Sequence, residues 1–400
     1  MARATPLIPP PCTDLPLGDG RALRIGGQIG RGSMATVYRA TYEGAFGLQR
    51  AVAVKVFDVV ASDEHDAVLE ALANAARRAA CLRHPNVVRV EDFGLASAAQ
   101  PYTIQELVEG RTLAAFATRL NRAGGRFPPD IALFVACEVA DALAAARLAS
   151  TPEGVRLGIF HGELSTSDVL LSWHGEVKVA DFGVSAAARA ASSVRSVRAF
   201  ARRIRALSPE VARGQTGDAR SDVFSLGVML REMLVGPRFP SFVTDTEALS
   251  WARDGIVHQS LFERRLAPPL QTILTRALER EPSRRYPHAG AMAYELRKVA
   301  LAMGVGDGRA FLRAALARAF GDGGADGHED EVTGEMRVPA SRPSGVVDRF
   351  ARLRGEDDGS LEPDVEEGLE SGTVLVANAS ALDEADEDDD DDEDDDAGRG

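Results

Sequence analysis

Cysteine is scarce in this chain, and its placement excludes two kinds of small-domain architecture. Only Cys12, Cys81 and Cys137 occur among the 400 residues, and they show neither the spacing of a zinc site nor the pairing pattern of a disulfide framework. Cys81 and Cys137 lie in apolar patterns with helical spacing, where a buried thiol behaves as a small hydrophobic group. So few cysteines fit a reducing compartment, and we expect a cytoplasmic location.

Long hydrophobic runs are also missing. No segment approaches the ~18 apolar residues of a membrane-spanning helix, and Val299–Val305 is among the longest candidates. Residues 1–20 are rich in proline and have too short an apolar run for a signal peptide. We therefore expect no membrane partner, and we interpret residues 1–21 as a disordered leader.

Positive and negative charges are unevenly distributed along the chain. Residues 1–320 hold 40 Lys and Arg against 32 Asp and Glu, a net charge of +8, whereas residues 321–400 hold 6 against 28, a net charge of −22. In Asp383–Asp396, 13 of the 14 residues are acidic. Because like charges repel, residues 321–400 are predicted to be a disordered acidic tail behind a basic folded body.

The segment Ile159–Gly183 carries the densest set of candidate functional residues. It is predicted to form a polar loop and then two strands around a turn at His174–Gly175. The loop contains Glu163 and Asp168, and Asp181 follows the second strand at the start of an Asp-Phe-Gly sequence. Mg²⁺ prefers hard oxygen ligands of this kind and shares them with phosphates. The segment therefore indicates a magnesium and phosphate site.

Upstream, a glycine-containing turn precedes two predicted strands. Gly30 and Gly32 would let the backbone approach a phosphate and offer its N–H groups, although two glycines alone are more often an ordinary hairpin turn. Val37 lies in the next predicted strand, and Ala53 and Lys55 lie in the strand after it. A glycine turn, a strand and a strand with a single lysine, in this order, are much rarer by chance.

In this order, the motifs resemble those of the protein kinase family, over residues 24–303. The resemblance is to the bacterial type of serine/threonine kinase, and it implies an α+β fold with two lobes. The smaller lobe, residues 22–108, would be an antiparallel sheet with one helix. The larger, mainly helical lobe would span residues 109–303, and residues 304–320 are predicted to add a C-terminal helix.

The same resemblance implies ATP and Mg²⁺ as ligands. Lys55 would hold the α- and β-phosphates, and Asp181 and Asp168 would hold the metal. A hinge between the lobes would then contain Glu106 to Val108, facing the adenine, and Glu109, a possible ribose contact.

The catalytic loop departs from the family pattern. Glu163 stands where the resemblance places the aspartate that accepts the substrate hydroxyl proton, and its extra methylene moves the carboxylate by about an ångström. Asp168 replaces a metal-binding asparagine, and Ser165 replaces a lysine that stabilises the transferring phosphate. Gly162 replaces an arginine that in many kinases pairs with a phosphorylated activation loop. Arg203 replaces a threonine near the end of the activation segment, which runs from Ser185 to Leu207. An arginine there should disturb substrate docking.

The helical glutamate that pairs with the nucleotide-binding lysine is also missing at its expected place. Counting back from His84-Pro85 puts Ala75 there, and Glu70 lies about 140° round the helix. An alternative alignment that restores Glu70 stays open. The residues that hold such a fold together are present: His161, Phe182, Asp222, Glu210 and Arg285.

The residues that hold the fold together are kept, whereas those that transfer phosphate are partly changed. This pattern favours a pseudokinase that binds ATP and Mg²⁺, transfers phosphate poorly, and regulates or scaffolds a protein partner. The alternatives are an active, unconventional kinase with Glu163 as base and an interaction module that needs no nucleotide. We expect no nucleic-acid partner. The acidic block could contact the activation segment as a salt-sensitive plug, although a solubilising tail is the simpler interpretation. The arginines concerned are Arg189, Arg195, Arg198, Arg202, Arg203 and Arg205.

Overall fold

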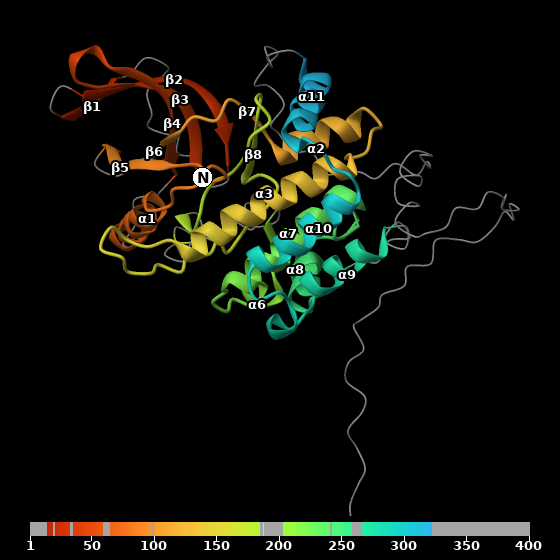
Figure 1. Cartoon of the computed structure of the whole chain (residues 1–400). Helices are drawn as coiled ribbons and strands as arrows, with labels where there is room; N and C mark the ends of the chain where they lie inside the picture. Colours follow the sequence, from red (N-terminus) through yellow and green to blue (C-terminus); the bar gives the residue numbers. More distant parts are fainter. Residues whose placement is uncertain are drawn as a thin grey trace, which may run out of the picture.

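The computed structural model shows two lobes, a sheet-rich one and a helical one (Figure 1). It describes residues 14–18, 21–32, 35–58, 65–97, 100–184, 187, 203–240, 242–257 and 266–321. The predictions for residues 1–13, for the arginines at 189, 195, 198 and 202, and for the tail from residue 322 lie outside these ranges.

Six antiparallel strands build the smaller lobe. In the order in which they lie side by side, they are β1 (Asp14–Gly18), β2 (Arg21–Arg31), β3 (Ala35–Glu43), β4 (Gln49–Phe57), β6 (Gln100–Glu106) and β5 (Val90–Ser97). Val52, Val54 and Val56 of β4 are buried in one apolar cluster. Because side chains alternate along a strand, Ala53 and Lys55 point to the other face of the sheet. That face is the one available for a ligand.

Strand β1 corrects the predicted disordered leader. Asp14–Gly18 pairs with β2, with Leu15 opposite Leu23. Leu15 and Leu17 alternate along the strand and pack against the cluster that contains Leu23. Their burial gives this part of the leader an apolar face, which the high proline content of the segment concealed.

The helix of the smaller lobe, α1 (His65–Ala80), covers the end of the sheet that carries Phe57. Its buried face includes Val68 and Leu72, which contact Phe57 in a second apolar cluster. A short 3-10 turn, Ala45–Gly47, connects β3 to β4. The lobe therefore contains the antiparallel sheet and single helix predicted for it.

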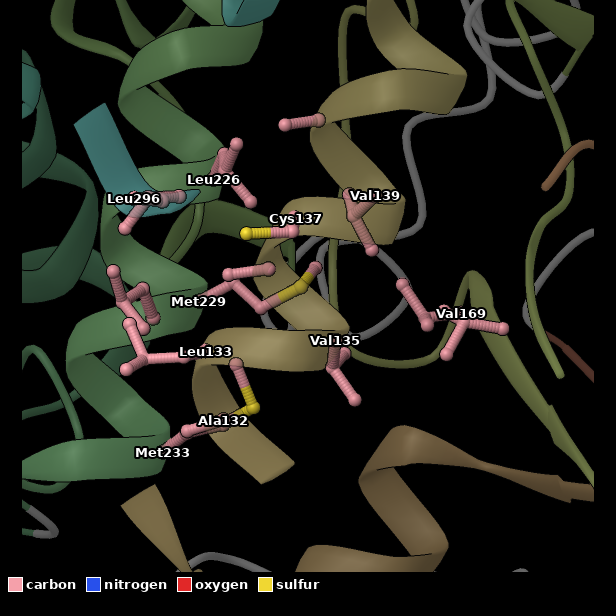
Figure 2. Close-up of a cluster of buried hydrophobic side chains, with 14 of the residues drawn as sticks. Ala132, Leu133, Val135, Cys137, Val139, Val169, Leu226, Met229, Met233 and Leu296 are labelled. Atoms are coloured by element: carbon pink, nitrogen blue, oxygen red, sulfur yellow. The ribbon is translucent and has the colours of Figure 1, made fainter. Parts of the chain in front are cut away.

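The larger lobe is built around a helix that is apolar on nearly all sides. Its elements are α2 (Leu113–Arg122), α3 (Pro129–Leu148), α6 (Pro209–Ala212), α7 (Ala219–Leu234), α8 (Asp245–Arg253), α9 (Pro268–Ala277), the 3-10 turn Pro282–Arg284, α10 (Ala289–Ala302) and α11 (Gly308–Phe320). Helix α3 is the apolar one, and a helix of this kind must be buried. Figure 2 shows its Leu133 and Cys137 among side chains that include Met229 of α7 and Leu296 of α10. Burial raises the pKa of the Cys137 thiol to about 12, so this cysteine is a core residue.

A second, three-stranded sheet joins the lobes and carries the candidate site. It contains β7 (Gly110–Thr112), β8 (Val169–Ser172) and β9 (Val177–Val179). The turn predicted at His174–Gly175 connects β8 to β9, and Gly175 adopts a positive φ of 80°. A Cβ at Gly175 would lie 2.2 Å from the Arg309 carbonyl oxygen, so glycine is what lets α11 pack against this turn.

The two-lobed α+β fold predicted from the sequence is confirmed. The predicted helix at the end of the folded body is α11, and it packs on the larger lobe through Leu312 and Leu316. In the ranges that the structure describes, no helix has both the length and the apolarity to cross a membrane.

Candidate nucleotide and phosphate-transfer site

The predicted nucleotide residues in the strands of the smaller lobe share one face of the sheet. Gly30 of β2 is opposite Val37 of β3, and Val37 is opposite Lys55 of β4. Ala53 lies two residues before Lys55 in β4, on the same face, and is opposite Gln105 of β6. Residues directly opposite one another share a face of a sheet, so these two rows form a single surface. It combines half-buried or buried apolar contacts with one cation.

The glycine turn follows the row that contains Gly30, Val37 and Lys55. The Gly32 N–H donates to the Ala35 carbonyl at 2.8 Å. A Cβ at Gly32 would lie 3.5 Å from the same oxygen, which is ordinary contact. The tip of the turn, residues 33–34, falls outside the described ranges.

Lys55 is buried and pairs with Asp181 across the lobes. Its side chain is 9% exposed, and its Nζ contacts Asp181 Oδ2. Asp181 has a φ of 66°, a conformation that non-glycine residues rarely adopt and that is concentrated at functional sites. Burial opposes the ionisation of Asp181, but Lys55, and further away Arg203, hold its pKa below the ordinary value. The carboxylate is therefore charged and positioned toward the sheet.

No helical carboxylate takes the place of Asp181 as the partner of Lys55 within the described residues. Ala75, the expected position of the helical glutamate, is buried at 9% exposure. Glu70 is exposed on α1. The structure therefore gives no support to the alignment that places Glu70 at the lysine.

The hinge residues are held by their own ion pairs. Glu106 at the end of β6 accepts from Lys178 Nζ at 2.9 Å, and Val108 is half-buried in the connection to β7. Glu109 pairs with Arg39 of β3 at 2.8 Å, with both side chains about half exposed. This pair links the two lobes, and Arg39 would have to release the Glu109 carboxylate for a ribose to bind there.

The catalytic loop holds Asp168 through both of its oxygens. Oδ2 accepts from the N–H and the hydroxyl of Ser165 at 2.9 and 2.7 Å. Oδ1 accepts from Arg203 at 3.3 Å. Asp168 is 3% exposed, so these donors satisfy a buried carboxylate.

Arg203 also contacts the candidate base. Its guanidinium lies 3.3 Å from Glu163 Oε2 and 3.4 Å from the Glu163 carbonyl. One arginine at the end of the activation segment therefore bridges Glu163 and Asp168; we call this arrangement the Arg203 clamp. The sequence predicted only disturbed docking at this position. The sequence did contain a hint of this contact. Relative to the family pattern, Ser165 removes a cation from the loop and Arg203 adds one elsewhere, so Arg203 could have been expected to replace the lost charge.

The carboxylates fit Mg²⁺ in one respect. Asp181 Oδ1 is buried and has no hydrogen-bond partner in the described part of the chain, so it offers lone pairs to a cation. Among those residues no cluster of three or more His, Cys, Asp or Glu could hold a metal. Mg²⁺ would therefore rest on Asp181 and Asp168 together with nucleotide phosphates, a common arrangement for this ion. When bound, it neutralises charge on the transferring phosphoryl group.

Below the loop, the predicted framework is in place. Asp222 accepts from the backbone N–H groups of His161 and Gly162 at 2.7 and 2.8 Å. His161 is 2% exposed, its Nε2 lies 2.9 Å from the Ala180 carbonyl, and its ring packs against Phe182. The prediction that His161 and Asp222 are structural is confirmed by these contacts.

Glu210 and Arg285 form the predicted buried pair at the far end of the activation segment. Their two bonds measure 2.7 and 2.9 Å, and the Ser221 hydroxyl adds a third at 2.7 Å. Burial alone would raise the pKa of Glu210, but Arg285 and Ser221 lower it to about 2.

Comparisons with known proteins agree with this geometry. A family described as protein tyrosine and serine/threonine kinase matches residues 23–293. Serine/threonine-protein kinase PknB of Mycobacterium leprae is 32% identical over 281 residues, which cover 69% of this chain and 42% of PknB. Tyrosine-protein kinase MasK of Myxococcus xanthus is 31% identical over 327 residues, covering 78% of this chain and 47% of MasK. The chain thus spans less than half the length of these relatives.

A solved structure shows the same fold. The kinase domain of Mycobacterium tuberculosis PknI superposes with a TM-score of 0.51 at 22% identity, over 74% of this chain and 99% of that domain. At this identity the likeness concerns the fold alone. With the family match over most of the folded body, and with lysine, Asp-Phe-Gly and framework pairs in their expected places, the chain belongs to the protein tyrosine and serine/threonine kinase family and is related to its bacterial serine/threonine members.

Proposed function

We propose that this chain is a pseudokinase: it binds ATP and Mg²⁺ between its lobes, transfers phosphate poorly, and acts as a regulatory or scaffolding module for a protein partner. The Arg203 clamp carries this proposal. It occupies the carboxylate that would accept the substrate proton and one of the two that would hold metal.

The clamp impairs transfer for a chemical reason. A general base must come within hydrogen-bond reach of the hydroxyl from which it takes the proton. Glu163 Oε2 has the Arg203 guanidinium at 3.3 Å instead, and arginine stays charged at any physiological pH. A substrate hydroxyl must therefore displace a cation before it can reach the base. The longer side chain of Glu163 adds a misplacement that can cost on the order of 10²-fold in rate.

Nucleotide binding is supported by a different set of residues. Lys55 provides a buried cation on the sheet face that also carries Val37 and Ala53. Asp181, in the segment after β9, contacts Lys55 through one oxygen and offers a second, Oδ1, that has no hydrogen-bond partner among the described residues. Neither feature depends on Arg203 leaving its position.

An active kinase with Glu163 as base is the second candidate. It is favoured by the kinase names of the relatives and by the length of the Arg203 contacts, both 3.3 Å, which phosphate oxygens could replace. In that case Arg203 would move to the nucleotide and free Glu163. The two candidates differ in phosphate transfer and agree in binding.

Binding is tested by thermal denaturation of the full chain with ATP, with and without Mg²⁺. Ligands that bind only the folded state stabilise it, so we expect the melting temperature to rise by several degrees at saturating MgATP. Asp181→Asn should lose most of the Mg²⁺-dependent part of this rise. Asp254→Asn, an exposed helix-end position, is the matched control. No rise in the wild type would contradict the proposal and favour an interaction module that needs no nucleotide.

A further inference from the structure

Helices α2 and α11 lie next to each other in the larger lobe (Figure 1). Their C-terminal ends meet, because Arg119 of α2 donates through Nε to the Ala319 carbonyl of α11 at 2.9 Å. The Phe116 and Phe320 rings pack beneath this contact at 6.4 Å. The two helices, 200 residues apart at their point of contact, therefore present their outer sides together.

This surface is basic and has no acidic residue of its own. Neither the 10 residues of α2 nor the 13 of α11 include Asp or Glu. Four of their arginines have exposed side chains, and we call these the α2–α11 arginine face: Arg119, Arg122, Arg313 and Arg318. A fifth exposed arginine, Arg309, lies at the N-terminal end of α11, where it pairs with Glu176.

Helix electrostatics explain only part of this composition. Cations in the last turn of a helix are favoured by the helix dipole, and Arg119, Arg122 and Arg318 occupy last turns. Arg313 lies in the middle of α11, where the dipole contributes little. The dipole also gives no reason for two neighbouring helices to lack acidic residues throughout. The face is suited to an acidic ligand.

Such a ligand is attached to the same helix. The chain leaves α11 at Gly321, and residues 321–400 carry a net charge of −22. Residues 322–382 separate α11 from the acidic block Asp383–Asp396. A chain of that length spans at most about 200 Å when fully extended. The block can therefore reach the α2–α11 arginine face, which lies where the tail begins.

The described part of the activation segment is less suited to the block. Arg203 is committed to Glu163 and Asp168, with its side chain 15% exposed. Arg205 is half-buried and donates to the Val243 carbonyl. We propose that the acidic block Asp383–Asp396 docks on the α2–α11 arginine face.

The proposal is tested by fluorescence anisotropy with a labelled peptide of sequence DEADEDDDDDEDDD, residues 383–396. The protein is the full chain in which each Asp and Glu of residues 383–396 is replaced by Asn or Gln, so that its own block does not compete. Two charge reversals are compared on this background. One is Arg122→Glu with Arg313→Glu and Arg318→Glu; the other, matched in charge, is Arg189→Glu with Arg195→Glu and Arg198→Glu. Arg119 is kept because it bonds α11.

We expect peptide binding at about 50 mM NaCl that weakens steeply as salt is added, because the contact is electrostatic. Reversal on the α2–α11 arginine face should weaken binding at least about tenfold, and reversal in the activation segment less than about twofold. Thermal denaturation checks that both variants remain folded. Equal weakening by the two reversals, weakening by the activation-segment reversal alone, or no binding at low salt would each overturn the proposal.

Discussion

Two arginine–carboxylate clusters lie at the C-terminal end of the activation segment, and they differ in how the arginine is used. Arg285 places two nitrogens on one carboxylate, that of Glu210, at 2.7 and 2.9 Å, with a fully buried side chain. Arg203 divides its guanidinium between two carboxylates, those of Glu163 and Asp168, at 3.3 Å each. The first is a two-pronged pair with short bonds, and the second is a bridge with long ones.

The difference separates what stabilises the fold from what controls the site. Bidentate, charge-assisted pairs are the strong ones, and they specify geometry as well as energy. A guanidinium shared at longer distances can be exchanged for another ligand at less cost. We infer that the Glu210–Arg285 pair stabilises the larger lobe, while the Arg203 clamp mainly decides which groups can enter the catalytic loop.

The largest expected effect is on stability, at the buried pair. Glu210→Gln leaves the Arg285 charge buried without its partner and should lower the free energy of unfolding by about 3–5 kcal/mol. Urea denaturation measures it. Glu163→Gln, the matched change in the other cluster, should cost about 1 kcal/mol or less because Arg203 keeps Asp168. Equal losses in the two variants would remove the distinction between the clusters.

The same pair predicts a pH dependence. The pKa of Glu210 is lowered from 4.5 to about 2, so its contribution to stability is complete above its unfolded pKa and is lost as the pH falls through the folded one. The difference in unfolding free energy between wild type and Glu210→Gln should therefore shrink between about pH 5 and pH 2. Chemical denaturation across this pH range measures the difference. A difference that stays constant would show that Arg285 does not lower the pKa of Glu210.

At the Arg203 clamp we expect a smaller loss of stability than at the buried pair, together with a gain in phosphate transfer. Arg203→Thr removes the cation and should raise phosphate transfer about tenfold by freeing Glu163. It also leaves the buried Asp168 Oδ1 without its donor, which should lower the unfolding free energy by about 1–3 kcal/mol. Transfer from labelled ATP and urea denaturation measure the two quantities. Arg213→Thr, at an exposed position outside the site, is the control. A fall in transfer would instead assign Arg203 to the phosphates, as the active-kinase candidate requires.

Features set by local spacing could be predicted from the sequence. The Lys55 strand and the hairpin before Asp181 follow from strand alternation and turn residues. The pairing of Glu210 with Arg285, 75 positions apart, could be expected only from the resemblance to the kinase family. The Arg203 clamp could not be predicted, because Arg203 stands where the family pattern has a threonine and no local pattern brings it to Glu163 and Asp168, 40 and 35 positions away. Strand β1 could not be predicted, because the prolines of residues 1–20 indicate disorder and its two leucines are buried only once β2 lies beside them.

The central claim is that this site binds nucleotide but transfers phosphate poorly, and single-turnover transfer from γ-labelled ATP tests it most directly. The full-length wild type is compared with Asp181→Ala on a generic protein substrate and in autophosphorylation. We predict incorporation by the wild type that is no greater than that of Asp181→Ala, at MgATP concentrations that stabilise the wild type thermally. Clear incorporation by the wild type that Asp181→Ala abolishes would contradict the claim and identify an active kinase.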